Sequence, residues 1–203
     1  MTAPLFHLPA GALGGVGPGG VLLLDGPEGR HAATVRRLAV GEPLLLADGS
    51  GVLAEGVVEG VGRDELTVRV ASLRDARPGG PTLVLVQALA KHDRDEAAVE
   101  TATELGVDEV LAWAAQRSIV QWRGKRGARA LAKWGTVAAA AAKQSRRATV
   151  PSVAGPVDLP ALVRRVGGAT SAYLLHEEAE TPLAGTDLPS EGEVLVIVGP
   201  EGG

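Results

Sequence analysis

The sequence has no cysteine and very few aromatic residues. Its 203 residues contain no Cys, and aromatic residues make up 2% of the chain. The lack of Cys excludes a disulfide scaffold, a thiolate metal site and a cysteine nucleophile, and it suits a reducing cytoplasm. No apolar run approaches the roughly 20 residues that cross a bilayer, and the first residues lack a signal-peptide pattern. We therefore expect a cytoplasmic protein without a membrane segment, whose core is filled mainly by Ala, Val and Leu.

The usual motifs of metal and nucleotide sites are also missing. The four histidines are scattered, and we expect no metal site; they are His7, His31, His92 and His176. Residues 15–20 match the pattern GxGxxG, but Pro18 lies inside it and a strand-like run follows it, so we predict a surface turn. The first strand of the later α/β region runs into Lys91 without a glycine loop. A nicotinamide-dependent oxidoreductase is therefore disfavoured.

Charge is segregated along the chain although the net charge is only −4. Between Val110 and Val157 there is no acidic residue. The basic residues of this segment are Arg117, Arg123, Lys125, Arg126, Arg129, Lys133, Lys143, Arg146 and Arg147. A local positive field on an acidic protein is typical of a surface that binds a polyanion. The alternative is a solvated helix face followed by a basic loop.

The first 75 residues have the pattern of a small β domain. Short apolar or alternating runs predict strands at 21–24, 43–47, 52–58 and 66–70, and one helix-like stretch covers about 29–39. Strands at this spacing suggest a small closed barrel. Residues 76–81 are predicted to form a linker, because the Pro and Gly residues in this segment continue neither a helix nor a strand.

Residues 82–203 alternate between strand and helix patterns. Strands are predicted at 83–89, 110–113, 173–175 and 194–198, and helices at 93–105, 128–147 and 159–166. This alternation predicts an α/β domain with a mostly parallel sheet. The long helix has an apolar face at Ala128, Leu131, Trp134, Ala138 and Ala141. A basic stripe lies beside that face at Arg129, Lys133, Lys143 and Arg147.

Two of the predicted strands end in polar or glycine-rich residues. The strand at 194–198 runs into Gly199-Pro-Glu-Gly-Gly203, and the strand at 173–175 runs into His176 and Glu177. Ligands of open α/β sheets bind beyond the carboxyl ends of the strands, where glycine lets the backbone approach them closely. These two loops either form one pocket or are ordinary turns.

Several segments together resemble the ribosomal RNA small subunit methyltransferase E family of the SPOUT, or knotted, methyltransferase class. The resemblance covers nearly the whole chain. It is carried by Gly199-Pro-Glu-Gly-Gly203, Leu175-His-Glu177, Gln87-Ala-Leu-Ala-Lys91, residues 102–109, Gln116-Arg-Ser118, Lys133-Trp134, Ala141-Ala-Lys-Gln-Ser-Arg-Arg147, and His31-Ala-Ala-Thr-Val-Arg-Arg37 with Asp48-Gly49. It implies a PUA-like β-barrel that binds RNA at 1–75 and a SPOUT α/β methyltransferase domain at 82–203.

Members of that family continue beyond the Gly-Pro-Glu-Gly-Gly motif with a further helix, a leucine-rich loop and a last helix. These parts thread the knot and complete the cofactor pocket. Because the sequence stops at Gly203, we expect an incomplete knot and a domain that lacks its C-terminal part. An RNA-binding protein without catalytic activity is therefore the alternative hypothesis.

The resemblance also implies an activity and its residues. The reaction is methylation of N3 of a uridine in 16S ribosomal RNA with S-adenosylmethionine as cofactor, and the partners are small-subunit ribosomal RNA, or the assembled small subunit, and a second copy of the chain. Candidate catalytic residues are Arg117, Gln144, Arg147 and Glu201. Candidate cofactor-binding residues are Leu175, His176, Glu177, Gly199, Pro200, Glu201, Gly202 and Gly203. Candidate RNA-binding residues are Arg30, His31, Arg36, Arg37, Arg123, Lys125, Arg126, Arg129, Lys133, Lys143 and Arg146.

Overall fold

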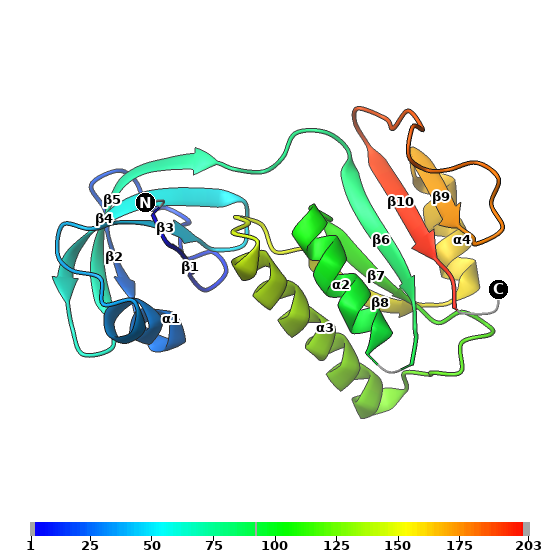
Figure 1. Cartoon of the computed structure of the whole chain (residues 1–203), viewed down its shortest axis with the longest axis horizontal. Coiled ribbons are helices and arrows are strands. Elements are labelled where there is room, and N and C mark those ends of the chain that lie inside the picture. The colour runs from blue at the N-terminus through cyan, green and yellow to red at the C-terminus, as the bar shows by residue number, and fades with distance from the viewer. Residues whose placement is uncertain (1–2, 92, 201–203) are drawn as a thin grey trace. The chain divides into compact units, whose positions relative to one another are not determined.

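The computed structural model describes residues 3–91 and 93–200. The chain divides into two compact units: the first comprises Met1–Pro78 and Lys143–Val150, and the second Gly79–Ala142 and Pro151–Gly203. Each contains one sheet (Figure 1). Among the described residues, no helix is both long and apolar enough to cross a membrane.

The first unit is a curled five-stranded sheet. Its strands are β1 (Leu5–His7), β2 (Val21–Leu24), β3 (Pro43–Ala47), β4 (Val52–Val61) and β5 (Leu66–Asp75). They pair in the order β1-β3-β4-β5-β2, with β1 parallel to β3 and the other pairs antiparallel. Between the described strands the ladder does not close, because β1 and β2 lie at its two edges. The small β domain is therefore present as a curled sheet.

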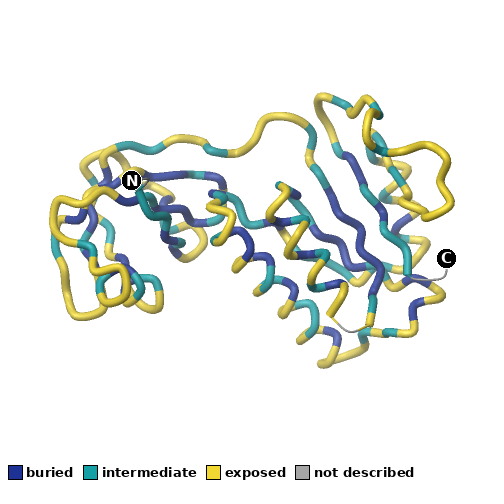
Figure 2. The backbone as a smooth tube through the Cα atoms, in the orientation of Figure 1, coloured by how far each residue is buried: buried dark blue, intermediate teal, exposed yellow. Residues whose placement is uncertain are grey.

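Alternating side chains build the core of this unit. In β5, Val68 and Val70 are buried while Arg69 between them is exposed, as the two-residue period of a half-buried strand requires. Phe6, Leu24 and Leu46 fill the interior from three other strands. Figure 2 shows the resulting alternation of buried and exposed backbone along the strands.

The helical stretch of the first unit starts earlier than the sequence suggests. Helix α1 (Gly26–Arg30) begins after Asp25 with Pro27 in its first turn, where a proline costs no hydrogen bond. It continues directly into the π-helical turn η1 (His31–Val35), which ends short of the expected residue 39. The ring of His31 packs edge-on against Phe6, with 5.9 Å between the ring centroids.

The segment Lys143–Val150 packs with the first unit, although the sequence suggested a continuous helix through residue 147 in the later domain. The amide of Val150 donates to the carbonyl of Gly49 over 3.1 Å. His7 Nε2 hydrogen-bonds to the carbonyl of Arg147 over 3.2 Å, and Lys143 forms an ion pair with Glu28. These contacts draw the chain away from the helix axis after Gln144.

The second unit is an α/β sandwich around a fully parallel sheet. Its strands are β6 (Thr82–Ala88), β7 (Glu109–Trp113), β8 (Ser152–Val157), β9 (Ser171–Leu175) and β10 (Glu193–Val198), and its helices are α2 (Arg94–Leu105), α3 (Gly124–Gln144) and α4 (Leu159–Gly168). The strand order is β8-β7-β6-β10-β9, and every pair is parallel. The predicted mostly parallel sheet is thus confirmed.

Helices cover both faces of this sheet (Figure 1). Leu85 of β6 packs with Val99 of α2 and Trp134 of α3, whereas Val84 and its neighbours on the opposite face pack with Leu162 of α4. Successive residues of a strand point to opposite faces, so one apolar run supplies both cores. This explains why the central strands lack polar alternation.

Two features of the second unit differ from the expectation. Strand β8 is missed by the sequence analysis because Gly155 and Pro156 interrupt its apolar pattern. Helix α3 starts at Gly124, and Gly127, not Ala128, is buried on its inner face beside Trp122. The predicted apolar positions Trp134, Ala138 and Ala141 are buried.

Candidate active site

The parallel register brings the carboxyl ends of four strands to one edge of the sheet. Val198 at the end of β10 pairs with Leu175 of β9 on one side and with Gln87 of β6 on the other. Ala88 of β6 in turn pairs with Trp113 of β7. The loops that follow these strands therefore emerge at the same edge, which is where open α/β sheets bind ligands.

The loop after β9 encloses a cavity of about 460 Å³. Leu175 and His176 line it, together with residues of the 179–186 loop. His176 closes a turn, because its Nδ1 accepts the amide hydrogen of Glu178 and its carbonyl accepts that of Ala179, each over 3.1 Å. The loop is therefore held by its own hydrogen bonds, and the exposed Glu177 lies within that turn.

The loop after β10 begins with Gly199 and Pro200. A Cβ atom on Gly199 would meet no described atom within 4 Å, so the backbone there borders open space. Pro200 lines a second cavity of about 290 Å³ with Leu89, Lys91 and Arg117. The predicted site residues Glu201, Gly202 and Gly203 lie outside the described residues.

The loop that carries Arg117 is fixed to the end of β6. The buried Ser118 donates from its hydroxyl to the carbonyl of Leu89 over 3.1 Å, and the amide of Leu89 donates to the carbonyl of Trp113 over 3.1 Å. These bonds place the exposed Arg117 beside Pro200 at the carboxyl edge. The structure thus brings one predicted catalytic residue together with one predicted cofactor residue.

Two other predicted catalytic residues belong to the first unit. Gln144 is the last residue of α3, and Arg147 donates to the hydroxyl of Thr149 over 2.9 Å. Helix α3 returns the chain from the carboxyl edge toward the amino edge, and its 21 residues extend for about 30 Å. The part of α3 that belongs to the second unit ends at Ala142, and it therefore runs toward the edge opposite Pro200.

Two lysines of the acid-free segment have carboxylate partners, which corrects the picture of an uncompensated basic stripe. Lys133 Nζ lies 2.6 Å from Glu96 and 3.9 Å from Asp93, and the hydrogen bond to Glu96 raises the pKa of the lysine. Lys143 pairs with Glu28. A segment without acidic residues can still have acidic neighbours in the fold, because all three carboxylates lie more than 30 residues away in the chain.

The other predicted RNA-binding residues are mostly exposed. At the start of α3 these are Arg123, Lys125, Arg126 and Arg129, and on the helical stretch of the first unit Arg30, Arg36 and Arg37. Arg146 is exposed and donates to the carbonyl of Ala3. His31 is half-buried against Phe6.

Several polar residues at this edge are not among the site residues predicted from the sequence, above all Lys91, Asp95 and Ser118. Burial raises the pKa of the Asp95 carboxyl, although it accepts the amide hydrogens of Glu96 over 2.9 Å and Ala90 over 3.3 Å. A buried acid with a raised pKa is common at functional sites. The signal was available, because Lys91 and Asp95 follow a buried strand just as Gly199 does.

Comparison with known proteins shows which family the chain belongs to. A model of the RNA methyltransferase domain matches residues 78–203, and a model of the RNA methyltransferase PUA domain matches residues 24–71. Ribosomal RNA small subunit methyltransferase E of Mycobacterium bovis is 44% identical over 189 residues, which cover 91% of this chain and 72% of that protein. The chain belongs to the ribosomal RNA small subunit methyltransferase E family. The protein of that name from Bacillus subtilis is 26% identical over 89% of this chain and 73% of its own length.

Solved structures agree with this assignment. A methyltransferase from Legionella pneumophila, in complex with the bound cofactor S-adenosylmethionine, superposes with a TM-score of 0.80 at 27% identity, over 100% of this chain and 82% of that one. A ribosomal RNA small subunit methyltransferase E from Neisseria gonorrhoeae, bound to S-adenosylmethionine, gives 0.78 at 26% identity, over 100% and 81%. The resemblance inferred from the sequence is confirmed, and with it the PUA-like and α/β fold class. The family favours an enzyme over an RNA-binding protein without catalytic activity.

Proposed function

We propose that this protein methylates N3 of a uridine in 16S ribosomal RNA, with S-adenosylmethionine as the methyl donor. The observation that carries the proposal is that Arg117 and Pro200 line one cavity at the carboxyl edge of a chain of this family. At the same edge, Leu175 of β9 pairs with Val198 at the end of β10. The substrate is small-subunit ribosomal RNA or the assembled small subunit.

The loops after β9 and β10 fit the cofactor. The open space at Gly199 allows close approach to the backbone, and the cavity at Leu175 offers apolar surface next to polar main chain, as an adenosine requires. We assign cofactor binding to Leu175, His176, Glu177, Gly199 and Pro200, and to Glu201, Gly202 and Gly203 beyond the described residues. Bound there, S-adenosylmethionine supplies a methyl group on a strongly electrophilic sulfonium.

The protein must hold the uridine in line and handle its N3 proton. Loss of that proton spreads negative charge onto the ring oxygens, and the guanidinium of Arg117, which lines the cavity, is our candidate to stabilise that charge. Glu201 is our candidate for the proton acceptor. Gln144 and Arg147 complete the set of candidate catalytic residues, from the first unit.

The exposed basic residues have the role of positioning the RNA. Phosphate contacts give affinity without reading sequence, and Arg123, Lys125, Arg126 and Arg129 form a cluster suited to them. Arg30, His31, Arg36 and Arg37 extend this role to the first unit. Arg146, Lys133 and Lys143 are weaker candidates, because the first donates to a main-chain carbonyl and the two lysines form ion pairs.

We also propose a homodimer in the cytoplasm. In such a dimer the first unit of one copy would present RNA to the carboxyl edge of the other. Light scattering of the purified protein tests this, and a monomer at working concentrations contradicts it.

The function itself is tested with labelled S-adenosylmethionine and small-subunit RNA. We expect label in the RNA, and mass spectrometry of its nucleosides should find the methyl group on N3 of uridine. Calorimetry should show that S-adenosylmethionine binds and that a nicotinamide dinucleotide does not. Methylation of a different base or position would contradict the proposal of N3, and RNA binding without methyl transfer would favour the non-catalytic alternative.

A further inference from the structure

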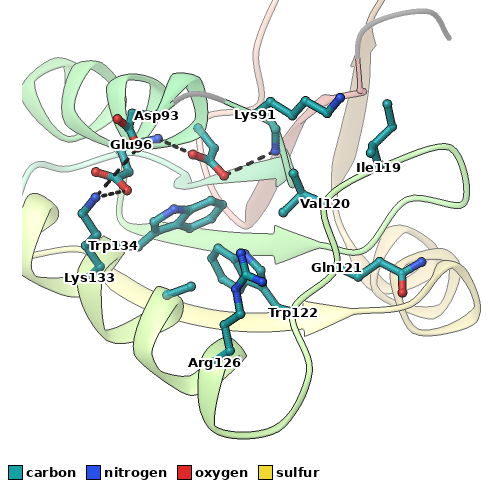
Figure 3. Close-up of a pocket in the computed structure, with 13 residues that line it drawn as sticks. Lys91, Asp93, Glu96, Ile119, Val120, Gln121, Trp122, Arg126, Lys133 and Trp134 are labelled. Carbon is teal, nitrogen blue, oxygen red and sulfur yellow. Dashed lines mark hydrogen bonds and ion pairs between the residues drawn. The ribbon is translucent and has the colours of Figure 1, made fainter.

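One cavity at the carboxyl edge has a wall in which only Arg126 and Lys133 belong to the proposed RNA-binding residues. It measures about 650 Å³ and lies between α2, the start of α3 and the 119–122 loop (Figure 3). It adjoins the cavity of Arg117 and Pro200, because the two share Ala90, Lys91, Ile119 and Val120 in their walls. A ligand here would therefore lie next to the reacting groups.

One wall of this cavity is aromatic. Trp122 packs edge-on against Trp134, with 4.9 Å between ring centroids and 72° between ring planes. Trp134 is 1% exposed and anchored in the core, whereas Trp122 is only half-buried. The buried ring thus fixes the orientation of the partly accessible one. In a chain with 2% aromatic residues, an accessible Trp in a cavity is a distinctive feature.

The charged side chains of the cavity include both signs, and they suit a ligand that combines a phosphate with a flat, polar ring. Exposed Arg126 and Lys91 supply two cations, and Figure 3 shows the Arg126 side chain extending from α3 toward Trp122. The acids Glu96 and Asp93 are paired with Lys133 on the α2 side. Asp95, 6% exposed, also lines the cavity, and its carboxylate accepts the amide hydrogens of Ala90 and Glu96.

We propose that this cavity binds an unstacked base of the RNA strand, from a nucleotide next to the one that is methylated. Single-stranded RNA is recognised in this way, by bases that stack on aromatic rings or guanidinium planes while cations hold the phosphates. Nucleotide-sized ligands occupy pockets of about 300–1,000 Å³. The inference rests on the proposed function for its RNA, and it adds Trp122 and Lys91 as residues that position the strand.

The first experiment observes the tryptophan directly. A short uridine-rich single-stranded RNA should quench tryptophan fluorescence, and the quenching should disappear in Trp122→Phe while fluorescence polarisation shows that this variant still binds the RNA. Phe is used because it keeps a ring against Trp134. The inference is overturned if the RNA does not quench, if Trp122→Phe quenches as strongly, or if inorganic tripolyphosphate quenches equally, since the last result would mean an anion site only.

The second experiment uses methyl transfer. Because stacking of one base contributes roughly 1–3 kcal/mol, Arg126→Ala should raise KM for RNA by about tenfold and leave kcat within about twofold. The matched control is Arg164→Ala, which removes an exposed arginine from α4 on the opposite face of the sheet and should change neither constant. Equal effects of the two substitutions would contradict the inference, because they would reflect charge alone.

The two experiments separate this inference from the proposed function. If RNA quenches the tryptophan fluorescence but no methyl group is transferred, the cavity assignment is supported and the proposed function is contradicted. If it methylates RNA while Trp122→Phe and Arg126→Ala behave like the parent protein, the function stands and the cavity assignment fails.

Discussion

The two edges of the parallel sheet in the second unit use their charged residues in opposite ways. At the amino edge, Arg165 of α4 bridges Glu109 and Glu193, the first residues of β7 and β10, with N–O distances of 2.8 and 2.6 Å. The hydrogen bonds to these two carboxylates raise the pKa of Arg165. Asp108 nearby accepts the amide hydrogen of Leu83 over 2.9 Å. Each of these charges has a partner that ties elements together.

At the carboxyl edge, the ionisable residues are either buried or line a cavity. The Asp95 carboxyl is buried and its pKa is raised, whereas Arg117, Lys91 and Arg126 line cavities. Such groups contribute little to folding, and their arrangement suits a ligand. We therefore expect that the amino edge stabilises the sheet and that the carboxyl edge carries the proposed site, so substitutions at the two edges should have different consequences.

The largest expected effect concerns RNA affinity at the carboxyl edge. Replacing Arg123, Lys125 and Arg126 by Glu at the start of α3 should weaken RNA binding by at least about 100-fold at low salt and flatten the plot of log K against log salt. Titrations at several salt concentrations measure both. An unchanged slope would mean that these residues do not contact phosphates, and it would contradict the assignment of RNA binding to the carboxyl edge.

Arg117→Ala should lower the rate of methyl transfer by about 100-fold, because removal of one charge-stabilising donor typically costs 10²–10³ in kcat. Its melting temperature should stay close to that of the parent protein, since the side chain is exposed and exposed polar interactions contribute little to stability. Single-turnover methylation and a thermal melt provide the two readouts. A lower melting temperature with an unchanged rate would mean that Arg117 stabilises the fold and takes no part in catalysis.

Gly199→Val should weaken S-adenosylmethionine binding by about tenfold or more, because the new side chain would fill the space that the backbone offers to the cofactor. The fold should persist, since the added Cβ meets no described atom within 4 Å. Calorimetry measures the affinity, and RNA binding within about threefold of the parent protein is the control. Loss of both affinities would show that the loop is structural.

At the amino edge, Arg165→Ala should reduce the free energy of unfolding by about 1–2 kcal/mol, because it leaves two half-buried carboxylates without a partner. The rate of methyl transfer per folded molecule should not change. Denaturant titration gives the first quantity and a rate measured well below the melting temperature gives the second. Undiminished stability with impaired methylation would contradict a purely structural amino edge.

The smallest effect is a pH dependence at Asp95. The pKa of this acid is higher in the folded protein than in the unfolded chain, so its neutral form is favoured by folding. The contribution of this carboxyl to the free energy of unfolding is fully present below about pH 4, the ordinary pKa of Asp. It declines as the pH rises through the pKa that the group has in the folded protein. Asp95→Asn should remove this decline from the plot of stability against pH. An identical slope in the two proteins would show that folding does not raise the pKa of Asp95.

Much of the fold follows from the sequence because its signals are local. Continuous apolar runs predict the buried strands β6 and β10, and Gly106 marks the end of α2, where it adopts a left-handed conformation and its amide caps the helix. What the sequence does not predict depends on tertiary contacts. Strand β8 is recognisable only from its pairing with β7, and the end of α3 depends on contacts that residues 143–150 make with the first unit.

The candidate site follows the same division. Gly199, Leu175 and Arg117 are predicted from strand ends and from resemblance, and the structure places them at one edge. The cavity at Trp122 is not predicted, because the sequence places Trp134 on the apolar face of the long helix but gives no role to Trp122. Only the packing of the two rings leaves one of them accessible. The ion pairs of Lys133 and Lys143 are likewise invisible to the sequence, since their partners are distant in the chain.

The division between the two edges is tested most directly by hydrogen–deuterium exchange of the protein with and without S-adenosylmethionine and small-subunit RNA. The account predicts that the cofactor slows exchange in the loops at 175–186 and from 199 onward, and that RNA adds protection at 115–126. The amino-edge segments at 106–109 and 190–193 should exchange at the same rate in every sample. Protection that appears first at the amino edge, with the carboxyl-edge loops unchanged, would contradict the account.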